Sequence, residues 1–325
     1  MTREAASLSK YDKRLLGQKA DELDFIRDTL EKVYRLVDTL EYLNQNPLLK
    51  ENLALKGGTA INLTIFNLPR LSIDIDLDYC NAASREEMLV EREIISKDIV
   101  KYMQTQNYTL SPKTKNTYSL DSWIFDYINS GGNNDNIKIE INYSMRTHIL
   151  PVKERKLSAD FLSIDLKINS LDVIDIFGSK IITLLNRTAA RDLYDVYNMV
   201  NLGIFNKNEY NLLKKSVIFY SAVSLIETKA EFNISAINTL TDQKIKTDLL
   251  PVIRKKELFN LELAKEIVKK FINELLILNP EEKKFLIYFK EKHYQPELLF
   301  NDPVIIERIK NHPMALWKIR NKNLY

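Results

Sequence analysis

The 325-residue chain contains few glycines, one cysteine and three histidines. Its 7 glycines are about 2% of the residues, against a usual share of about 7%, which argues against a glycine-rich β-sandwich, a Rossmann Gly-x-Gly-x-x-Gly site and a collagen-like chain. Because Cys80 is the single cysteine, neither an intramolecular disulfide nor a cysteine-based zinc site can form. The histidines His148, His293 and His312 lack the spacing of a metal-binding motif.

Long apolar runs are also missing. The N-terminal stretch MTREAASLSKYDKRL has no apolar segment of the secretory type. No uncharged apolar run reaches the roughly 18 residues that a transmembrane helix needs. We therefore expect a cytoplasmic protein with no membrane partner. Hydrophobic residues make up 45% and charged residues 28%, a composition and length that suit one large domain or two ordinary ones.

Charge is distributed unevenly along the chain. Residues 1–200 carry 26 Lys and Arg against 29 Asp and Glu, a net charge of 26 − 29 = −3. Residues 201–325 carry 21 against 15, a net charge of 21 − 15 = +6. The asymmetry agrees with a first part that binds cations and a second part that meets an acidic partner, and equally with ordinary solvated helix faces.

The hydrophobic pattern changes along the chain from mixed to helical. Residues 19–44 have the three- and four-residue spacing of a helix, and residues 71–79 alternate as a strand does. Ser84 and Glu87 predict a capping box at the start of a helix that continues to about residue 106. From about residue 171 the pattern is helical, with candidate helices at 175–187, 189–202 and 207–227 among others. We therefore expect an α/β domain over residues 1–203 with an N-terminal helix, and a helical domain over residues 204–325.

A Gly57-Gly58-Thr59 turn separates a short apolar segment, Leu53 to Leu55, from a short helix predicted over residues 59–66. Glycines let a backbone approach a phosphate closely, and free amides at a helix start bind anions. The same residues also suit a purely structural tight turn.

Acidic residues alternate with apolar ones in the predicted strand 71–79. Residues two apart on a strand point to the same side, so Asp74 and Asp76 face one way and Ile75 faces the core. Stacked like charges are unfavourable without a positive partner, and magnesium ions would supply one. The same pattern also suits the solvent-facing side of an amphipathic strand. Asp78 shares this side but lies where strands bend, so we leave it out of the site. Glu140, on a second predicted strand, is a candidate third carboxylate.

A second group of charged residues lies on the predicted helices after residue 175. Lys180 and Arg187 are seven residues apart and so share a helix face, where they could hold a triphosphate. Arg191 and Asp195 are four apart and could pair within a helix. Taken alone, such a pair indicates an ordinary surface ion pair.

Together these features follow the ground plan of polymerase-β-like nucleotidyltransferases: a Gly-Gly turn, a short helix, and Asp-x-Asp on the next strand. The runs LKGGTAINLTIFNLPRLSIDIDLDY and FGSKIITLLNRTAARDLYDVY resemble the AbiEii/AbiGii toxin family of nucleotidyltransferases, found in bacterial abortive-infection and toxin–antitoxin systems. The later NHPMALWK is also similar. The resemblance implies an α+β fold, with a polymerase-β-like core of a mixed sheet flanked by helices and a mostly α-helical C-terminal region.

The resemblance also implies roles for individual residues. Gly57, Gly58 and Thr59 would hold the nucleotide phosphates, Lys180 would contact the triphosphate, and Asp192 would be the acidic residue of the last motif. The expected magnesium ligands are Asp74 and Asp76, with Glu140 as the third, and further nucleotide contacts are expected from Lys56, Ser72 and Arg187. Arg70 and Ser72 lead into Asp-x-Asp as they do in the family. The sequence departs from the family pattern at Thr59, where Ser is common, and at Ile73, where an acidic residue is common.

The function implied is that of a magnesium-dependent nucleotidyltransferase toxin. It would transfer a nucleoside monophosphate from a nucleoside triphosphate to the 3′ end of tRNA or another RNA, with release of pyrophosphate. The implied outcome is growth arrest in phage defence, held off by a cognate antitoxin. Two alternatives stay open at this point: an enzyme that modifies a small molecule or a protein, and a non-catalytic binding protein on the same scaffold.

Overall fold

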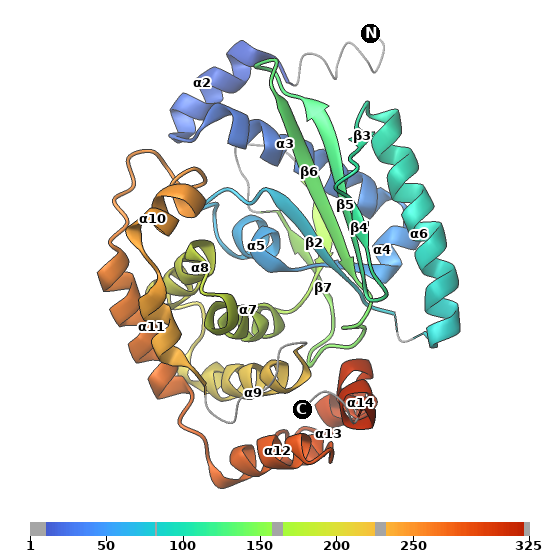
Figure 1. The fold of residues 1–325 in the computed structure, drawn as a ribbon, viewed down its shortest axis with the longest axis vertical. Helices are drawn as coiled ribbons and strands as arrows, with labels where there is room; N and C mark the ends of the chain where they lie inside the picture. The colour runs from blue at the N-terminus through green and yellow to red at the C-terminus, as the bar shows by residue number, and fades with distance from the viewer. Residues whose placement is uncertain (1–10, 82, 158–164, 225–231, 322–325) are drawn as a thin grey trace. The chain divides into compact units, whose positions relative to one another are not determined.

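The computed structural model describes residues 11–81, 83–157, 165–224 and 232–321 (Figure 1). These residues form two compact units. The first unit contains the described residues up to Tyr143 together with Glu154–Ser170 and Leu250–Leu258, and the second contains the others. The segment from residue 171 to 203, which we expected in the first domain, thus packs within the second unit. As a functional division, the boundary after residue 203 stays a prediction.

The first unit is built on a mixed sheet, as the sequence predicts. Its described strands run in the order β3-β5-β6-β2-β1-β8-β7, with β4 paired to β5. The pairs β2–β6 and β1–β8 are parallel, whereas β1–β2 and β5–β6 are antiparallel. The bounds are β1 Leu53–Leu55, β2 Asp74–Tyr79, β3 Thr109–Leu110, β4 Lys115–Asn116, β5 Leu120–Ile128, β6 Asn134–Asn142, β7 Lys153–Lys156 and β8 Lys167–Ser170.

Helices flank this sheet, and α3 packs against β6 and β8 through its buried apolar stripe. Ser84 and Glu87 form the predicted capping box at the start of α6, which lies beside β3 in Figure 1. The short α5 continues into the π-helical turn η1, where a simple helix over residues 59–66 was expected. The bounds are α2 Lys13–Leu23, α3 Arg27–Gln45, α4 Pro47–Asn52, α5 Gly57–Ala60, η1 Ile61–Ile65 and α6 Arg85–Thr105.

The single helix expected over residues 19–44 is wrong, because the chain turns between α2 and α3. Asp24 adopts a left-handed conformation with φ of 63°. Its backbone carbonyl accepts a hydrogen bond from the amide of Lys255, and its carboxylate accepts one from the amide of Lys256. These partners come from a distant part of the sequence, so helical periodicity could not indicate the break.

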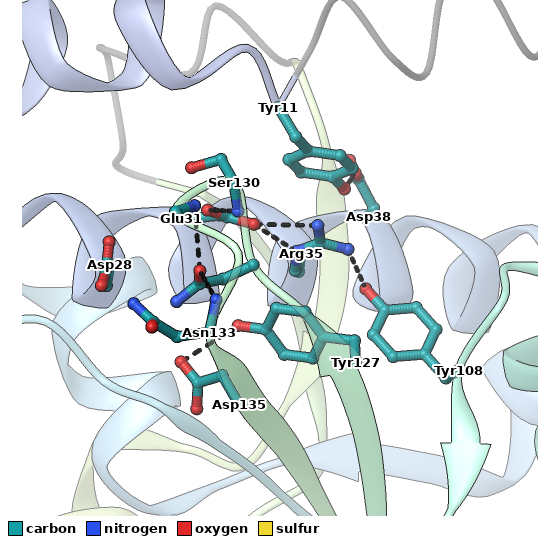
Figure 2. A network of polar contacts seen from close by, with 12 residues as sticks. Tyr11, Asp28, Glu31, Arg35, Asp38, Tyr108, Tyr127, Ser130, Asn133 and Asp135 are labelled. Carbon is teal, nitrogen blue, oxygen red and sulfur yellow. Dashed lines mark hydrogen bonds and ion pairs between the residues drawn. The ribbon is translucent and has the colours of Figure 1, made fainter.

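A buried ion pair ties the β5–β6 hairpin to α3 (Figure 2). Glu31 has no exposed surface and lies 2.8 Å from the Arg35 guanidinium. Its second oxygen accepts a hydrogen bond of 2.8 Å from the Ser130 amide at the hairpin turn. Arg35 in turn lies between the rings of Tyr11 and Tyr127, at 4.1 and 4.2 Å from their centroids. The tether fixes the end of the hairpin from which β6 starts.

The described part of the second unit is helical. The bounds are α7 Val173–Arg187, α8 Ala190–Asn201, α9 Lys207–Val223, η3 Ile234–Thr239, α10 Asp242–Lys244, η4 Ile245–Leu249, α11 Leu261–Leu275, α12 Pro280–Lys290, η5 Pro296–Leu298, α13 Pro303–Ile309 and α14 Pro313–Arg320. α7 packs on α8 and α9, and α8 packs on α11. Of the predicted helix 207–227, residues 225–227 lie outside the described ranges. None of the helices described in either unit has the length and apolar character needed to cross a membrane.

Candidate active site

The Gly-Gly turn lies in direct contact with the Asp-x-Asp strand. Gly57 has φ of +66°, and a Cβ placed on it would lie 2.5 Å from Oδ2 of Asp76. A Cβ on Gly58 would lie 2.5 Å from a guanidinium nitrogen of Arg70 and 3.2 Å from the Ser72 hydroxyl. Gly57 is therefore required by its positive φ and by the closeness of Asp76, whereas a side chain at Gly58 would displace the end of the Arg70 side chain.

The hydroxyls of Thr59 and Ser72 hold this turn against the strand. Thr59 is fully buried and donates a hydrogen bond to the backbone carbonyl of Asp74. Its oxygen lies 2.8 Å from the hydroxyl of Ser72. The Asn62 amide on η1 donates to the carbonyl of Gly58 at 2.8 Å, a contact that the sequence did not indicate. These bonds fix the turn, and contacts from Thr59 or Ser72 to a nucleotide stay predictions.

Asp74 and Asp76 lie on β2 and are half-buried, with the fully buried Ile75 between them. In the parallel pair β2–β6, Asp76 is in register with Glu140 and Asp74 with Lys138. The Glu140 carboxylate forms an ion pair of 2.8 Å with Lys138. No group of three or more His, Cys, Asp or Glu side chains is placed to hold a metal ion within the described ranges. Glu140 as a third ligand thus stays a prediction.

Lys56, a predicted nucleotide contact, forms an ion pair of 2.5 Å with the buried Asp78. Burial alone would lower the pKa of Lys56, but the Asp78 carboxylate outweighs burial and raises it. Lys56 is therefore protonated at neutral pH. We left Asp78 out of the acidic pair, and its carboxylate is bound to Lys56 beside the start of the turn.

A second cluster lies in the second unit, on α7 and α8. The Lys180 ammonium is 3.0 Å from Asp192 and 3.2 Å from Asp195. Arg187 donates two hydrogen bonds to the Asp192 carboxylate, at 2.6 and 2.9 Å. Burial would raise the pKa of Asp192, but Lys180 and Arg187 hold it well below its usual range. The carboxylate is therefore ionised and fixes both cations.

The structure thus brings the predicted residues together in two sets. The first set belongs to the first unit, and its members are Lys56, Gly57, Gly58, Thr59, Ser72, Asp74, Asp76 and Glu140. The second set belongs to the second unit, and its members are Lys180, Arg187 and Asp192. Asp195 is an addition to this second set, since it contacts Lys180. The sequence indicates this addition, because residues three apart on a helix share a face and Asp195 follows Asp192 by three.

Cys80 and His148 both have ordinary structural contacts. The thiol of Cys80 is half-buried and lies 3.4 Å from the backbone carbonyl of Asp78. His148 is buried, and its Nδ1 lies 3.2 Å from the Tyr220 hydroxyl.

Comparison with known proteins gives a family and a fold. Residues 39–288 match the family described as nucleotidyl transferase AbiEii toxin, type IV toxin–antitoxin system. Among solved structures, the chain is similar to MenT4, a nucleotidyltransferase toxin from Mycobacterium tuberculosis H37Rv, with a TM-score of 0.61 and 15% identity. That match covers 95% of this chain and 99% of MenT4. At this identity it establishes the fold. A search of curated proteins gave no match.

The family match spans both clusters, the Gly-Gly turn with Asp-x-Asp and the Lys180–Asp192 group. The fold of MenT4 agrees with the α+β architecture expected from the sequence. The chain therefore belongs to the AbiEii family of nucleotidyltransferase toxins of type IV toxin–antitoxin systems.

Proposed function

We propose that this protein transfers a nucleoside monophosphate from a nucleoside triphosphate to the 3′ end of tRNA, and that the transfer depends on Mg²⁺. The observation that carries the proposal is the close approach of Gly57 to Asp76. It places a backbone turn without side chains directly beside an acidic pair. This arrangement suits a nucleotide whose phosphates share a cation with carboxylates.

The donor set fits magnesium. Asp74 and Asp76 alternate on β2, and both are half-buried. Mg²⁺ is usually bound by one or two carboxylates together with substrate phosphates and water, so a third protein carboxylate is not required. When bound, the ion would neutralise charge on the phosphates. Asp74 and Asp76 are the residues that would hold it.

The remaining residues of the two clusters would bind and orient the nucleotide. Gly57 and Gly58 would admit the phosphates close to the backbone. Lys180 is buried between two carboxylates, whereas 62% of the Arg187 side chain is exposed while its guanidinium is anchored by Asp192. Arg187 thus exposes more of its side chain than Lys180, and by resemblance to the family both cations are proposed to contact the triphosphate, with Asp192 holding them in position. The acceptor hydroxyl would attack the α-phosphorus as its bond to pyrophosphate breaks.

A transfer assay tests this proposal. The protein would be mixed with Mg²⁺, total bacterial tRNA and one α-labelled nucleoside triphosphate at a time. We expect label in the RNA with at least one nucleotide, and a loss of about 100-fold or more for Asp74→Asn and for Asp76→Asn, because positioning and charge neutralisation supply most of the rate. Asp126→Asn is the matched control, since Asp126 is a half-buried carboxylate on β5 of the same sheet.

Further reactions separate the acceptors. Oxidation of the tRNA 3′ diol with periodate should abolish labelling if the 3′ end accepts the nucleotide. Label that persists, or enters a protein or a small molecule, would replace the tRNA acceptor by another. No label in any acceptor tested would favour a non-catalytic binding protein.

The family also implies a partner antitoxin. We propose that a cognate antitoxin restrains the activity in the cell and that its loss leads to growth arrest, as in phage defence. Expression of the protein with and without the neighbouring gene would test this, and the Asp76→Asn variant should be harmless in both backgrounds.

A further inference from the structure

A segment from late in the sequence, Leu250–Leu258, packs in the first unit as a strap. It follows η4 and precedes α11, both of which belong to the second unit. Within the strap, Val252 and Ile253 are almost fully buried. Burial of two β-branched residues in a segment without regular structure indicates that the strap is a fixed part of this unit and not a loosely attached loop.

One end of the strap is held at the turn between α2 and α3. Arg254 donates a hydrogen bond of 2.5 Å to the carbonyl of Leu23, and its guanidinium lies 4.8 Å from the centroid of the Phe25 ring. The amides of the next two residues donate to the backbone carbonyl and the carboxylate of Asp24, at 2.7 and 2.8 Å. The strap therefore satisfies the carbonyls left at the end of α2.

A second set of contacts joins the strap to the segment that leads into β2. The amide of Leu71 donates a hydrogen bond of 2.7 Å to the carbonyl of Val252. Arg70 and Ile253 form an isolated antiparallel bridge. This pairing explains why β2 begins at Asp74 and not at residue 71, as the alternation predicted. Residues 70 and 71 pair with the strap before the chain enters the sheet.

Arg70 connects this pairing to the Gly-Gly turn. Its side chain is buried, and one of its guanidinium nitrogens is 2.5 Å from the place that a Cβ on Gly58 would occupy. A second nitrogen donates to the carbonyl of Leu71 at 3.0 Å. Arg70 thus pairs with the strap through its backbone and lies against Gly58 through its guanidinium.

We infer that the Leu250–Leu258 strap positions the nucleotide-binding turn, and that Arg254 is a positioning residue for nucleotide transfer that acts through Ile253 and Arg70. The inference rests on the proposed function, in which the turn at Gly57 and Gly58 receives the nucleotide phosphates. Arg254 touches neither the turn nor the acidic pair. Its effect should therefore be on the affinity for the nucleoside triphosphate and not on the chemical step.

The test uses the full chain with Arg254→Ala, Arg254→Lys and, as a matched control, Lys255→Ala. Lys255 is the neighbouring residue on the strap, and its ion pair with Asp21 is exposed, so its loss should matter little. For Arg254→Ala we expect a KM for the nucleoside triphosphate raised about tenfold, with kcat and the KM for RNA within about twofold of wild type. Arg254→Lys, which keeps a donor for the Leu23 carbonyl, should recover part of the affinity.

Hydrogen exchange supplies a readout that does not need activity. The amide of Leu71 should exchange faster in Arg254→Ala than in Lys255→Ala, while amides of the β5–β6 pair stay protected in both. Equal exchange at Leu71 in the two variants overturns the inference whether or not the wild type transfers nucleotide. An unchanged KM of Arg254→Ala for the nucleoside triphosphate also overturns the inference. The same holds if kcat of this variant falls only in proportion to the amount of folded protein. A wild type that transfers no nucleotide, with faster exchange at Leu71 in Arg254→Ala, would reject the proposed function and retain the positioning of Arg70 by the strap.

Discussion

At the scale of single residues, two glycines share a backbone conformation but differ in the space around them. Gly57 and Gly132 both have positive φ, of +66° and +86°. Around Gly132 a Cβ would meet nothing within 4 Å, whereas at Gly57 it would lie 2.5 Å from the Asp76 carboxylate. Gly57 is therefore required by conformation and by space, and Gly132 by conformation alone.

The pair gives a controlled prediction. Gly132→Ala should lower the free energy of unfolding by about 1–2 kcal/mol, the cost of a left-handed alanine, and leave transfer activity intact. Gly57→Ala should carry a similar strain and in addition displace Asp76, so that activity falls about 100-fold. Urea unfolding and the transfer assay measure the two effects. Equal activity in the two variants would contradict a special role for the space at Gly57.

A buried carboxyl also makes stability depend on pH near neutrality. Asp175 on α7 is fully buried, and burial raises its pKa to about 7, although hydrogen bonds from Tyr220 and the amides of Ile149 and Leu150 oppose the shift. The protonated Asp175 carboxyl is the form that the folded state favours, so its contribution to the free energy of unfolding is complete below the unfolded pKa of about 3.9. This contribution is lost as the pH rises from there to the folded-state pKa of about 7. His312, whose pKa is lowered to about 3 by burial, acts oppositely, because its contribution is lost as pH falls below about 6.5.

Comparison with Asp175→Asn isolates the carboxyl, because His312 is common to both proteins. The free energy of unfolding of wild type, relative to the variant, should decrease between pH 5 and pH 8. The expected slope is about 1.4 kcal/mol for each pH unit up to the folded-state pKa and zero above it. Urea titrations at four pH values provide the measurement. A difference that does not change with pH would show that Asp175 is ionised throughout.

At the scale of elements, α3 and the β5–β6 hairpin are joined by charge as well as by apolar packing. The Glu31–Arg35 pair is almost fully buried, and the second Glu31 oxygen binds the backbone of the hairpin turn (Figure 2). Removal of one partner of a buried pair leaves the other charge without compensation. The tether therefore contributes to stability and fixes the register of β6, which carries Glu140 beside Asp76.

Glu31→Gln should destabilise the protein by about 3–5 kcal/mol, because the Arg35 guanidinium stays buried without its carboxylate. The control is Glu22→Gln, which removes an exposed ion pair with Lys19 at 2.9 Å and should change stability by less than about 1 kcal/mol. Thermal and urea unfolding of both variants measure the difference. If the two variants were equally stable, the buried pair would have no net structural value.

The elements differ in how well local patterns predicted them. Strict alternation predicted most of β2, and a capping box predicted the start of α6, because both signals arise within a few residues. The break at Asp24 and the late start of β2 were not predictable in this way. Both depend on hydrogen bonds to the strap, whose residues lie more than 170 positions away in the sequence.

At the scale of the whole molecule, the compact units are not continuous in sequence. The first unit needs Leu250–Leu258, and the second includes α7 and α8. Gly178 of α7 also packs closely on α9, since a Cβ there would lie 2.0 Å from the Ser216 hydroxyl. A fragment that ends at residue 203 therefore lacks parts of both units.

Residues 1–203 alone should not fold cooperatively, although the sequence pattern marks them as a domain. The strap would be absent, the amide of Leu71 would lose its partner, and α7 would expose the face that packs on α9. Circular dichroism melts and amide spectra of the fragment and of the full chain would measure this. A sharp, cooperative melt of the fragment would instead show that residues 1–203 form an independent domain.

The sequence by itself determined the motifs of this protein: a turn of two glycines, an alternating acidic pair, and the charged residues around Lys180 and Asp192, each encoded within about 20 neighbouring residues. For the acidic pair local spacing suffices, because backbone geometry alone decides which side chains of a strand share a face. The contact between Lys180 on α7 and Asp192 on α8 depends on how the two helices pack. Only the tertiary structure decided how the turn is held. Arg70 contacts Gly58, and the strap fixes Arg70. Such contacts depend on which distant segments pack together, and no local periodicity encodes that choice.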